Sequence, residues 1–565
     1  MIKKLSLDLF EKKKSGDKMN QLTRFAIIFL SIMVLFSFST EIITAQTNIK
    51  DSIKYQLLLF EDYRNNSLKI KSPYFSNELA SFYKNNKFSP IWYKNGFNES
   101  ALELMEIIRD IEREGLFPAS YRYEYLNKNL FKDDLDIEDK ALTEIILSNS
   151  YLLLASHFTN GLLSPETYEK NWLDIKNTIN ISQFLANAKN KERIRDSLYS
   201  LLPQTENYKK MRAHYNRYKK IKDNGGFQDI DIGRVVEKGM RGYDIKQIKI
   251  RLQQTDDFDG KVNISFDKEL HEAVTNFQKR HGLTPDGIVG KETKIALNKD
   301  IDKRVKMISI NMERLRWLPQ KLGETYIFVN IADYKLNVVE KQKNIMNMKV
   351  IVGKEQRSTP VFSDEITYLV INPAWNLPKS IAVEDKLPLI KENINYLSNN
   401  NYKVLKISEG KFEEADPKKI NWEELDKDNF NYYLKQEPGP NNALGRIKFM
   451  FPNKYSVYLH DTPQKELFEK TERSFSSGCI RLEEPFKLAE YILKKNNMWK
   501  PKKIEKILTS EEETKIDLTE KIPIHIIYMT AWVNDEGQLQ FRDDIYSRDK
   551  NLIEVFYSQK EGRYE

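Results

Sequence analysis

The spacing of apolar residues predicts helices in the first part of the chain. In the stretch ESALELMEIIRDIEREG, apolar residues recur every three or four positions, and Gly115 closes it as a typical C-terminal cap. The stretch ALTEIILSNSYLLLASHF is apolar nearly all round, as in a helix at the centre of a core, and we interpret its His157 as a core or edge histidine. These patterns predict a helical region from about residue 51 to residue 228.

A second helical unit follows at residues 232–299. Helical spacing on two segments predicts one core face, formed by Ile245, Ile248, Leu252, Leu270, Val274 and Phe277. The turn LTPDGIVG then precedes a third helix, Lys291–Leu297. We interpret His271 and His281 as helix-surface residues, because no acidic residue or cysteine stands at metal-ligand spacing from them. The unit is therefore expected to be a compact three-helix domain.

From about residue 325 the pattern changes to strands. β-branched and aromatic residues dominate the stretches TYIFVNIADYKLNVVE, IMNMKVIVG, EITYLVINPAW, IKFMFPNKYSVYLHD and IPIHIIYMTAWV. We expect FPNKY to be a hairpin loop that brings His460 to the end of a strand, and His525 to pack within its own strand. A polar insertion at about 376–433 is expected to form helices and loops, as a lid or binding wall. The fold class is multidomain α+β, with a mostly-β C-terminal domain.

Composition narrows the class of protein. A chain of 565 residues exceeds what one core can hold and suggests roughly three to four domains. The 90 basic and 82 acidic residues leave a net charge of +8, without an arginine-rich run or a basic stripe interleaved with aromatic residues. We therefore expect no nucleic-acid partner.

The N-terminus has the layout of an export signal. Basic residues precede the apolar run FAIIFLSIMVLFSF, and STEIITAQ follows it, which is typical of a signal peptide cleaved after Ala45. If the apolar run is read through Ile43, residues 25–43 could instead anchor the chain in the inner membrane, with the basic side in the cytoplasm. Both interpretations place the bulk of the chain outside the inner membrane.

Cys479 is the only cysteine of the chain. In an exported protein a lone cysteine forms an intermolecular bridge, lies inert in a core, or reacts. The flanking SFSSGCIRLEEP favours reaction, because its small residues give a substrate access and the amides of Gly478 and Cys479 could face a developing oxyanion. His460 could lower the thiol pKa below its free value of about 8.5, if the fold brings the two together.

The stretch HDTPQKELFEKTERSFSSGCIRL resembles the catalytic signature of the L,D-transpeptidases, a histidine followed by SxGCxR. The region 304–549 is similar to the large periplasmic L,D-transpeptidases in NMERLRWLP, VGKEQRSTPVFS, INPAWNLPKSIA, PGPNNALGRIKFMFPN and TAWVNDEGQLQFRDDIYSRD. The unit 232–299 resembles the small peptidoglycan-binding domain, through AVxxFQ at 273–278 and GLxxDGxxGxxT at 282–293.

The resemblance implies roles for the matching positions. Cys479 would be the nucleophile and His460 the general base that later returns the proton. Ser477 and Gly478 correspond to the small residues of the motif. Arg481 corresponds to its arginine, which we expect to brace the loop, to form a structural salt bridge, or to meet a substrate carboxylate.

Five further residues are candidates around the nucleophile. Asp461 could orient His460 through its carboxylate or through its backbone carbonyl. Tyr458, Arg473, Trp375 and Asn376 are candidate residues of a substrate pocket, and each could equally serve ordinary packing.

The resemblance also implies a domain order and an activity. The expected domains are a signal peptide or anchor, a helical scaffold domain, a peptidoglycan-binding domain and a catalytic domain, at 1–45, 46–228, 229–300 and 301–565. Without a nucleotide, metal or other cofactor, the enzyme would transfer the acyl group of a tetrapeptide donor to a neighbouring stem amine, release D-alanine and form a 3→3 cross-link in periplasmic peptidoglycan. The alternatives are hydrolysis of the same stems by an L,D-carboxypeptidase, attachment of a protein or D-amino acid to peptidoglycan, and a non-catalytic wall-binding scaffold.

Overall fold

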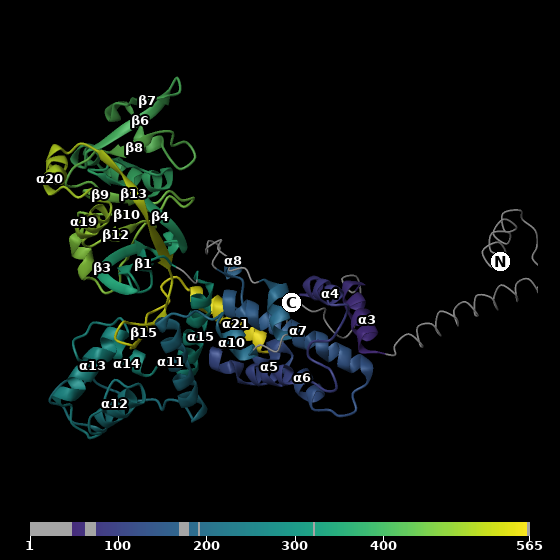
Figure 1. The fold of residues 1–565 in the computed structure, drawn as a ribbon. Coiled ribbons are helices and arrows are strands. Elements are labelled where there is room, and N and C mark those ends of the chain that lie inside the picture. Colours follow the sequence, from purple (N-terminus) through teal and green to yellow (C-terminus); the bar gives the residue numbers. More distant parts are fainter. Residues whose placement is uncertain (1–47, 63–74, 169–179, 190–192, 320–321, 562–565) are drawn as a thin grey trace, which may run out of the picture. The chain divides into compact units, whose positions relative to one another are not determined.

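The computed structural model describes residues 48–62, 75–168, 180–189, 193–319 and 322–561 (Figure 1). Contacts divide the chain into two compact units. The first contains the described residues up to 109, then 121–154 and 180–197, and the second contains the others. The expected signal peptide or anchor lies outside the described residues. Within the described ranges, no helix combines the length and apolarity that crossing a membrane requires.

The N-terminal region is helical, as its apolar spacing predicted. Its helices are α3 (Ile49–Asp62), α4 (Ser76–Asn85), α5 (Glu99–Asp110), α6 (Tyr123–Leu130), α7 (Ile137–Asn160), α8 (Pro165–Tyr168), α9 (Ile181–Lys189), α10 (Ile194–Tyr199) and α11 (Glu206–Asp223). Residues 141–154 of α7 are all buried, which confirms the predicted central helix. Inside the first unit, its buried Glu144 accepts hydrogen bonds from Tyr83 Oη at 2.8 Å and from the Ile91 amide at 2.6 Å. Gly115 caps a 3₁₀ turn at a left-handed φ of 72°, which suits glycine.

Three helices form the second domain, as predicted. They are α12 (Tyr243–Gln254), α13 (Lys268–Arg280) and α14 (Lys291–Leu297), and the bounds of α14 are those expected from the sequence. The six residues of the predicted core face are all buried in one cluster. The expectation for His281 was wrong, because this side chain is buried. Its Nδ1 lies 2.7 Å from the Phe277 carbonyl oxygen, and its ring stacks on Phe541 with centroids 5.4 Å apart.

Nine strands form the main sheet of the C-terminal domain. They are β1 (Thr325–Asn330), β2 (Lys335–Glu340), β3 (Lys343–Gly353), β4 (Phe362–Ile371), β9 (Ile447–Met450), β10 (Leu459–His460), β11 (Ser474–Ser476), β12 (Ile480–Leu482) and β13 (Thr514–Ile527). Their order is β11-β3-β12-β10-β9-β4-β13-β1-β2, and β2 also pairs with β3, so the ladder of pairings closes on itself. The predicted strand stretches therefore belong to a closed, mostly-β domain.

Helices and a hairpin complete this domain. They are α15 (Ile301–Trp317), α19 (Pro485–Lys495), α20 (Pro501–Ser510), α21 (Arg548–Ser558), β14 (Ala531–Val533) and β15 (Leu539–Phe541). The bounds of α19 match the stretch PFKLAEYILKK, which directly follows the cysteine segment. His525 packs within β13 as expected, with Nδ1 2.5 Å from Ser363 Oγ.

The insertion contains a sheet that the sequence analysis did not anticipate. Its helices are α16 (Lys379–Ile381), α17 (Leu387–Glu392) and α18 (Asn395–Asn399). Its strands are β6 (Tyr402–Ser408), β7 (Lys411–Glu414) and β8 (Tyr433–Gln436), and β8 also pairs with β5 (Trp375–Asn376). Figure 1 shows β6, β7 and β8 grouped beyond one end of the main sheet. One face of this small sheet covers a core that includes Tyr402, Val404, Trp422 and Leu434. The short, highly charged strands hide this arrangement in the sequence.

Candidate active site

The pairing of β10 with β12 brings the two candidate catalytic residues together. The strands run parallel, with Leu459 opposite Ile480 and His460 opposite Arg481. Cys479 directly precedes β12 and stands two positions before Arg481, so the alternation of side chains puts it on the same face as His460. Residues far apart in the sequence thus become diagonal neighbours.

The loop before the nucleophile depends on a glycine. Gly478 has a φ of +113°, a conformation that side chains with a Cβ rarely adopt. Ser476 Oγ accepts a hydrogen bond from the Gly478 amide at 3.1 Å and donates one to the Cys479 carbonyl at 2.5 Å. The Gly478 amide is therefore engaged within the loop. Among the described residues, no acceptor binds the Cys479 amide, so of these two amides it is the candidate oxyanion donor.

Burial makes the Cys479 thiol a weak acid. It raises the thiol pKa to about 11, while hydrogen bonds from the Tyr458 backbone and side chain, and the charge of Arg481, act in the opposite direction. The Sγ donates a hydrogen bond to the Ser456 carbonyl oxygen, 3.7 Å away. The expected lowering of the thiol pKa is therefore not found, because desolvation outweighs the neighbouring charge and donors.

His460 is buried and neutral. Burial and the charge of Arg481 lower its pKa to about 3, although the Asp461 and Leu444 carbonyls favour the protonated ring. Its Nδ1 lies 2.6 Å from the Asp461 carbonyl oxygen, which can only accept. In the neutral ring, Nδ1 thus carries the proton and Nε2 has the free lone pair of a base. The described contacts include no direct hydrogen bond from this ring to Cys479, so proton transfer requires a side-chain rotation or one bridging water.

Tyr458 lies beside the thiol and the imidazole. Burial, followed by the Cys479 charge, raises the Tyr458 pKa well above its usual value. Its ring meets the His460 ring edge-on, with centroids 5.7 Å apart. Trp375 on β5 is half-buried against the core of the insertion, whereas the neighbouring Asn376 is exposed.

Asp461 contacts the histidine through its backbone and uses its carboxylate elsewhere. The carboxylate accepts from the Arg446 amide at 2.9 Å and from Lys465 Nζ at 2.7 Å. Of the two orienting routes expected from the sequence, the structure thus contains the carbonyl contact with His460.

Arg481 carries a positive charge beside the thiol. Its Nη1 donates to Gln464 Oε1 at 2.7 Å, whereas its buried Nε has no hydrogen-bond partner among the described residues. Across the part of the chain that the structure describes, no carboxylate forms a salt bridge with it. Burial lowers the Arg481 pKa, and the Cys479 charge opposes that shift. This guanidinium can therefore stabilise negative charge on sulfur or on a bound ligand.

Arg473 forms its hydrogen bonds within the fold. Its guanidinium nitrogens donate to the backbone carbonyls of Val350, Lys470, Thr471 and Tyr334. The side chain is 8% exposed, so these internal bonds leave it little access to a ligand. The packing alternative for this arginine is the one that its contacts favour.

Two residues that the sequence analysis did not single out contact the nucleophile loop. Arg357 Nη1 donates to Ser477 Oγ at 3.0 Å, and Thr359 Oγ1 donates to the Gly478 carbonyl at 2.9 Å. Both stand in VGKEQRSTPVFS, a stretch already matched to the family. The similarity of this stretch to the family was the sequence signal that could have pointed to Arg357 and Thr359. Their contacts with the nucleophile loop depend on the pairing of β3 with β11, which no local pattern reveals.

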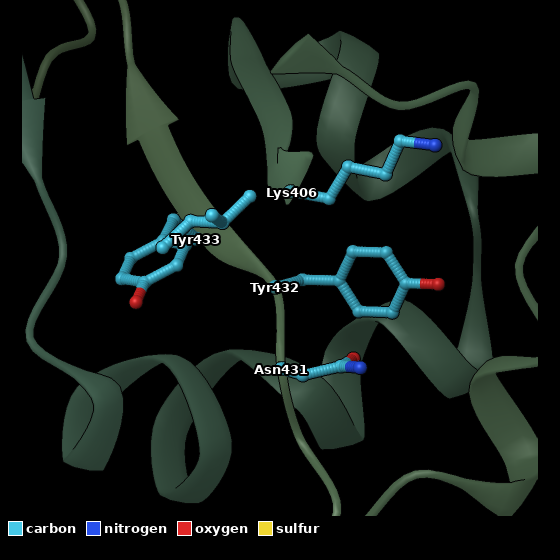
Figure 2. Close-up of a pocket in the computed structure, with 5 residues that line it drawn as sticks. Lys406, Asn431, Tyr432 and Tyr433 are labelled. Carbon is cyan, nitrogen blue, oxygen red and sulfur yellow. The ribbon is translucent and has the colours of Figure 1, made fainter. Parts of the chain in front are cut away.

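A separate pocket of about 330 Å³ lies on the insertion, away from the residues of this site. Its lining is Lys406, Ile407, Asn431, Tyr432 and Tyr433. Figure 2 shows the side chains of Lys406, Asn431 and Tyr432 extending in one direction and that of Tyr433 in the other. Neither Cys479 nor His460 contributes to it.

Comparisons with family models define the class of the three regions. Residues 324–505 match the model described as "L,D-transpeptidase catalytic domain", residues 77–214 the "Scaffold domain", and residues 241–297 the "Putative peptidoglycan binding domain". The chain therefore combines an L,D-transpeptidase catalytic domain of the YkuD type with a peptidoglycan-binding domain and a scaffold domain, as the sequence resemblance implied.

A curated relative supports the same class of protein. Over 250 residues the chain is 36% identical to the "Putative L,D-transpeptidase" of Haemophilus influenzae, a match that covers 44% of this chain and 49% of that protein. The matched part thus spans about half the length of this relative.

Solved structures with some similarity include two L,D-transpeptidases. The one from Xylanimonas cellulosilytica is 12% identical, with coverage of 53% of this chain and 99% of that chain and a TM-score of 0.16. The one from Stackebrandtia nassauensis is 14% identical, with coverage of 52% and 94% and a TM-score of 0.21. The assignment of the class depends on the family models and on the curated relative.

Proposed function

We propose that the protein is an L,D-transpeptidase of the cell envelope that forms 3→3 cross-links in peptidoglycan, with Cys479 as nucleophile and His460 as general base. The observation that carries the proposal is the β10–β12 register, which sets these two side chains on one face inside a matched catalytic domain. The family match indicates the class of reaction. The β10–β12 register accounts for a cysteine and a histidine on one face that could perform it.

Acylation begins from a neutral pair. Nε2 of His460 takes the thiol proton as Sγ of Cys479 attacks the carbonyl carbon of the third residue of a tetrapeptide stem. The Cys479 amide donates to the oxyanion that develops, and Arg481 offsets its negative charge. When the intermediate collapses, the amine of D-alanine leaves with the proton from the imidazolium. The product is a thioester, so the energy of the broken peptide bond is retained and no nucleotide is required.

Transfer reverses these roles. The side-chain amine of a neighbouring stem attacks the thioester, its proton passes to Nε2, and the sulfur leaves and recovers a proton from the ring. One peptide bond has been exchanged for another. The insertion, which Arg357 links to the nucleophile loop, would limit the access of water to the thioester. The domain at 241–297 would hold the enzyme on the polymer and raise the local concentration of stems.

Two other outcomes share the same acyl-enzyme. Water as acceptor would make the protein an L,D-carboxypeptidase, and another amine would attach a protein or a free D-amino acid to peptidoglycan. A non-catalytic scaffold would not need the retained cysteine–histidine pair, and we regard the enzyme as the better proposal.

Intact-mass spectrometry tests the proposal. Purified protein with a tetrapeptide donor should gain the mass of the tripeptidyl group, and adding an amine acceptor should release a cross-linked dimer. Cys479→Ala should show neither product, and His460→Gln should acylate by about 10²–10⁴-fold more slowly, the usual contribution of a general base. His525→Gln is the matched control, since this buried histidine of the same domain lies outside the site. A wild-type protein that remains unmodified would refute the proposal, and tripeptide without dimer would favour hydrolysis.

A further inference from the structure

A segment beyond the matched catalytic domain reaches the nucleophile loop. We name residues 528–549 the C-terminal brace. It follows β13, and the family match ends at residue 505. Tyr546 of the brace is buried, donates from its hydroxyl to the Gly353 carbonyl and accepts from the Thr359 amide at 3.3 Å. The brace therefore contacts both the end of β3 and the turn that follows it.

Thr359 links the brace to the nucleophile loop through hydrogen bonds. Its fully buried hydroxyl accepts from the Gly353 amide at 2.9 Å and donates to the Gly478 carbonyl at 2.9 Å. Gly353 is packed so closely that a Cβ added there would lie 3.1 Å from the Gly478 Cα and 2.2 Å from the Arg357 carbonyl oxygen. The β3 end and the nucleophile loop thus fit together without a gap.

The Gly478 carbonyl and the Cys479 amide belong to the same peptide group. This group is planar and trans, since the chain has no cis peptide bond among the described residues, and its carbonyl and N–H point in opposite directions. A hydroxyl that holds the carbonyl on one side therefore fixes the N–H on the other. If this peptide rotated, the Cys479 amide would no longer face a developing oxyanion.

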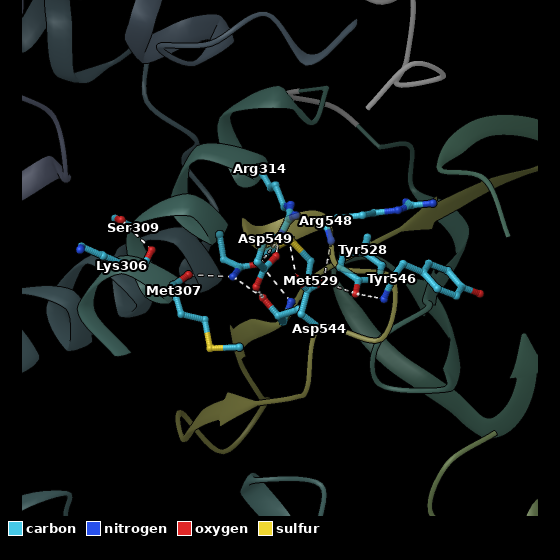
Figure 3. Close-up of polar contacts among 12 residues, drawn as sticks. Lys306, Met307, Ser309, Arg314, Tyr528, Met529, Asp544, Tyr546, Arg548 and Asp549 are labelled. Carbon is cyan, nitrogen blue, oxygen red and sulfur yellow. Dashed lines mark hydrogen bonds and ion pairs between the residues drawn. The ribbon is translucent and has the colours of Figure 1, made fainter. Parts of the chain in front are cut away.

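The brace itself is anchored by buried polar contacts (Figure 3). Arg314 on α15 forms an ion pair with Asp549 at 2.6 Å, and Thr530 Oγ1 donates to the same carboxylate at 2.6 Å. Closer to the loop, the Tyr546 amide donates to Tyr528 Oη at 3.0 Å, and the two rings stack with centroids 5.7 Å apart. The hydroxyl of Tyr546 therefore has a fixed position.

We propose that Thr359 and Tyr546 are positioning residues that orient the Gly478–Cys479 peptide, so that the Cys479 amide meets the oxyanion during acylation. The proposal deepens the function proposed above and depends on it. Neither residue touches the reacting atoms. Thr359 acts through a hydrogen bond to Gly478, and Tyr546 acts by holding Gly353 and Thr359.

Two reactions of the Cys479 thiol distinguish a loss of orientation of the Gly478–Cys479 peptide from general damage to the site. Alkylation by iodoacetamide forms no oxyanion, whereas acylation by a tetrapeptide donor does. Thr359→Val, which keeps the shape and removes the hydroxyl, should slow acylation by about 10- to 100-fold, because complete loss of one oxyanion donor costs about 10²–10³ in rate. Alkylation should change by less than about threefold, since that step needs no oxyanion donor.

Three variants complete the test. Thr359→Ser restores the hydroxyl and should recover most of the acylation rate. Tyr546→Phe is a smaller change that keeps the ring, and it should likewise slow acylation without slowing alkylation. If Thr359→Val does not fold, Tyr546→Phe tests the proposal. Thr367→Val is the control, because its hydroxyl bonds the Met450 carbonyl of the same sheet at 3.2 Å, away from the loop.

The outcomes distinguish this proposal from the function on which it depends. If folded Thr359→Val and Tyr546→Phe acylate at the wild-type rate while Cys479→Ala is inert, the positioning role is overturned and the enzyme remains. Equal losses in alkylation and acylation would also overturn it, because they indicate damage to the thiol itself. If the wild type is not acylated, the proposed function fails and the positioning role fails with it.

Discussion

Arg357 forms an ion pair with Asp385, with 2.6 Å between Nη1 and Oδ2. The same Nη1 donates to Ser477 Oγ at 3.0 Å, two residues before the nucleophile. A second ion pair joins this guanidinium to Glu384, and both carboxylates belong to the helical turn 382–386 of the insertion. One side chain thus holds the insertion against the nucleophile loop.

Removing this guanidinium should open the insertion. Arg357→Met should raise the fraction of acyl-enzyme lost to water relative to amine transfer by up to about fivefold, since partly exposed ion pairs contribute about 1 kcal/mol or less. The ratio of hydrolysed tripeptide to cross-linked dimer, measured by mass spectrometry, checks this. Asp385→Asn should shift the ratio in the same direction. An unchanged ratio in both variants would mean that the ion pair does not control water access.

The reactivity of the thiol should depend on pH as a buried thiol and not as a preformed ion pair. With a Cys479 pKa of about 11 and a His460 pKa of about 3, both groups are neutral at pH 7. The thiolate is the nucleophile, so the alkylation rate should rise with pH throughout the range from 6 to about 10. Because the chain has one cysteine, the added mass reports on that site alone. A plateau beginning below pH 7 would contradict this expectation.

The ion pair at the base of the C-terminal brace should matter for stability. Arg314 and Asp549 are both buried, so Asp549→Ala leaves an uncompensated charge and should lower the free energy of unfolding by about 3–5 kcal/mol. Asp517→Ala is the control, because its ion pair with Lys515 is exposed and should contribute about 1 kcal/mol or less. Urea titrations followed by tryptophan fluorescence compare the two variants. Equal midpoints would show that the buried pair contributes no more than the exposed one.

Local patterns were sufficient for most of the elements and for the choice of Cys479 as candidate nucleophile. The bounds of α14 and α19 match the predicted stretches, because helical spacing is read from consecutive residues. The small residues around Cys479 and the strand-end position of His460 were visible for the same reason. These features depend on neighbours in the sequence.

Features that depend on distant partners could not be predicted. His281 is buried by Phe541, which follows it by 260 positions, so its own helix resembles a surface helix. The thiol pKa is raised because folding removes water from the sulfur, and no motif encodes the extent of that desolvation. Thr359 contacts Gly478 only after β3 and β11 have paired.

The parallel pairing of β10 with β12 also determines when the chain acquires its chemistry. A slip of one residue between these strands would turn one partner to the opposite side of the sheet. Until two segments nineteen positions apart have paired in a single alignment, the sulfur behaves as any free thiol and the imidazole as any free ring. An incompletely folded molecule therefore lacks the cysteine–histidine pair, and catalytic competence reports that these two strands have paired.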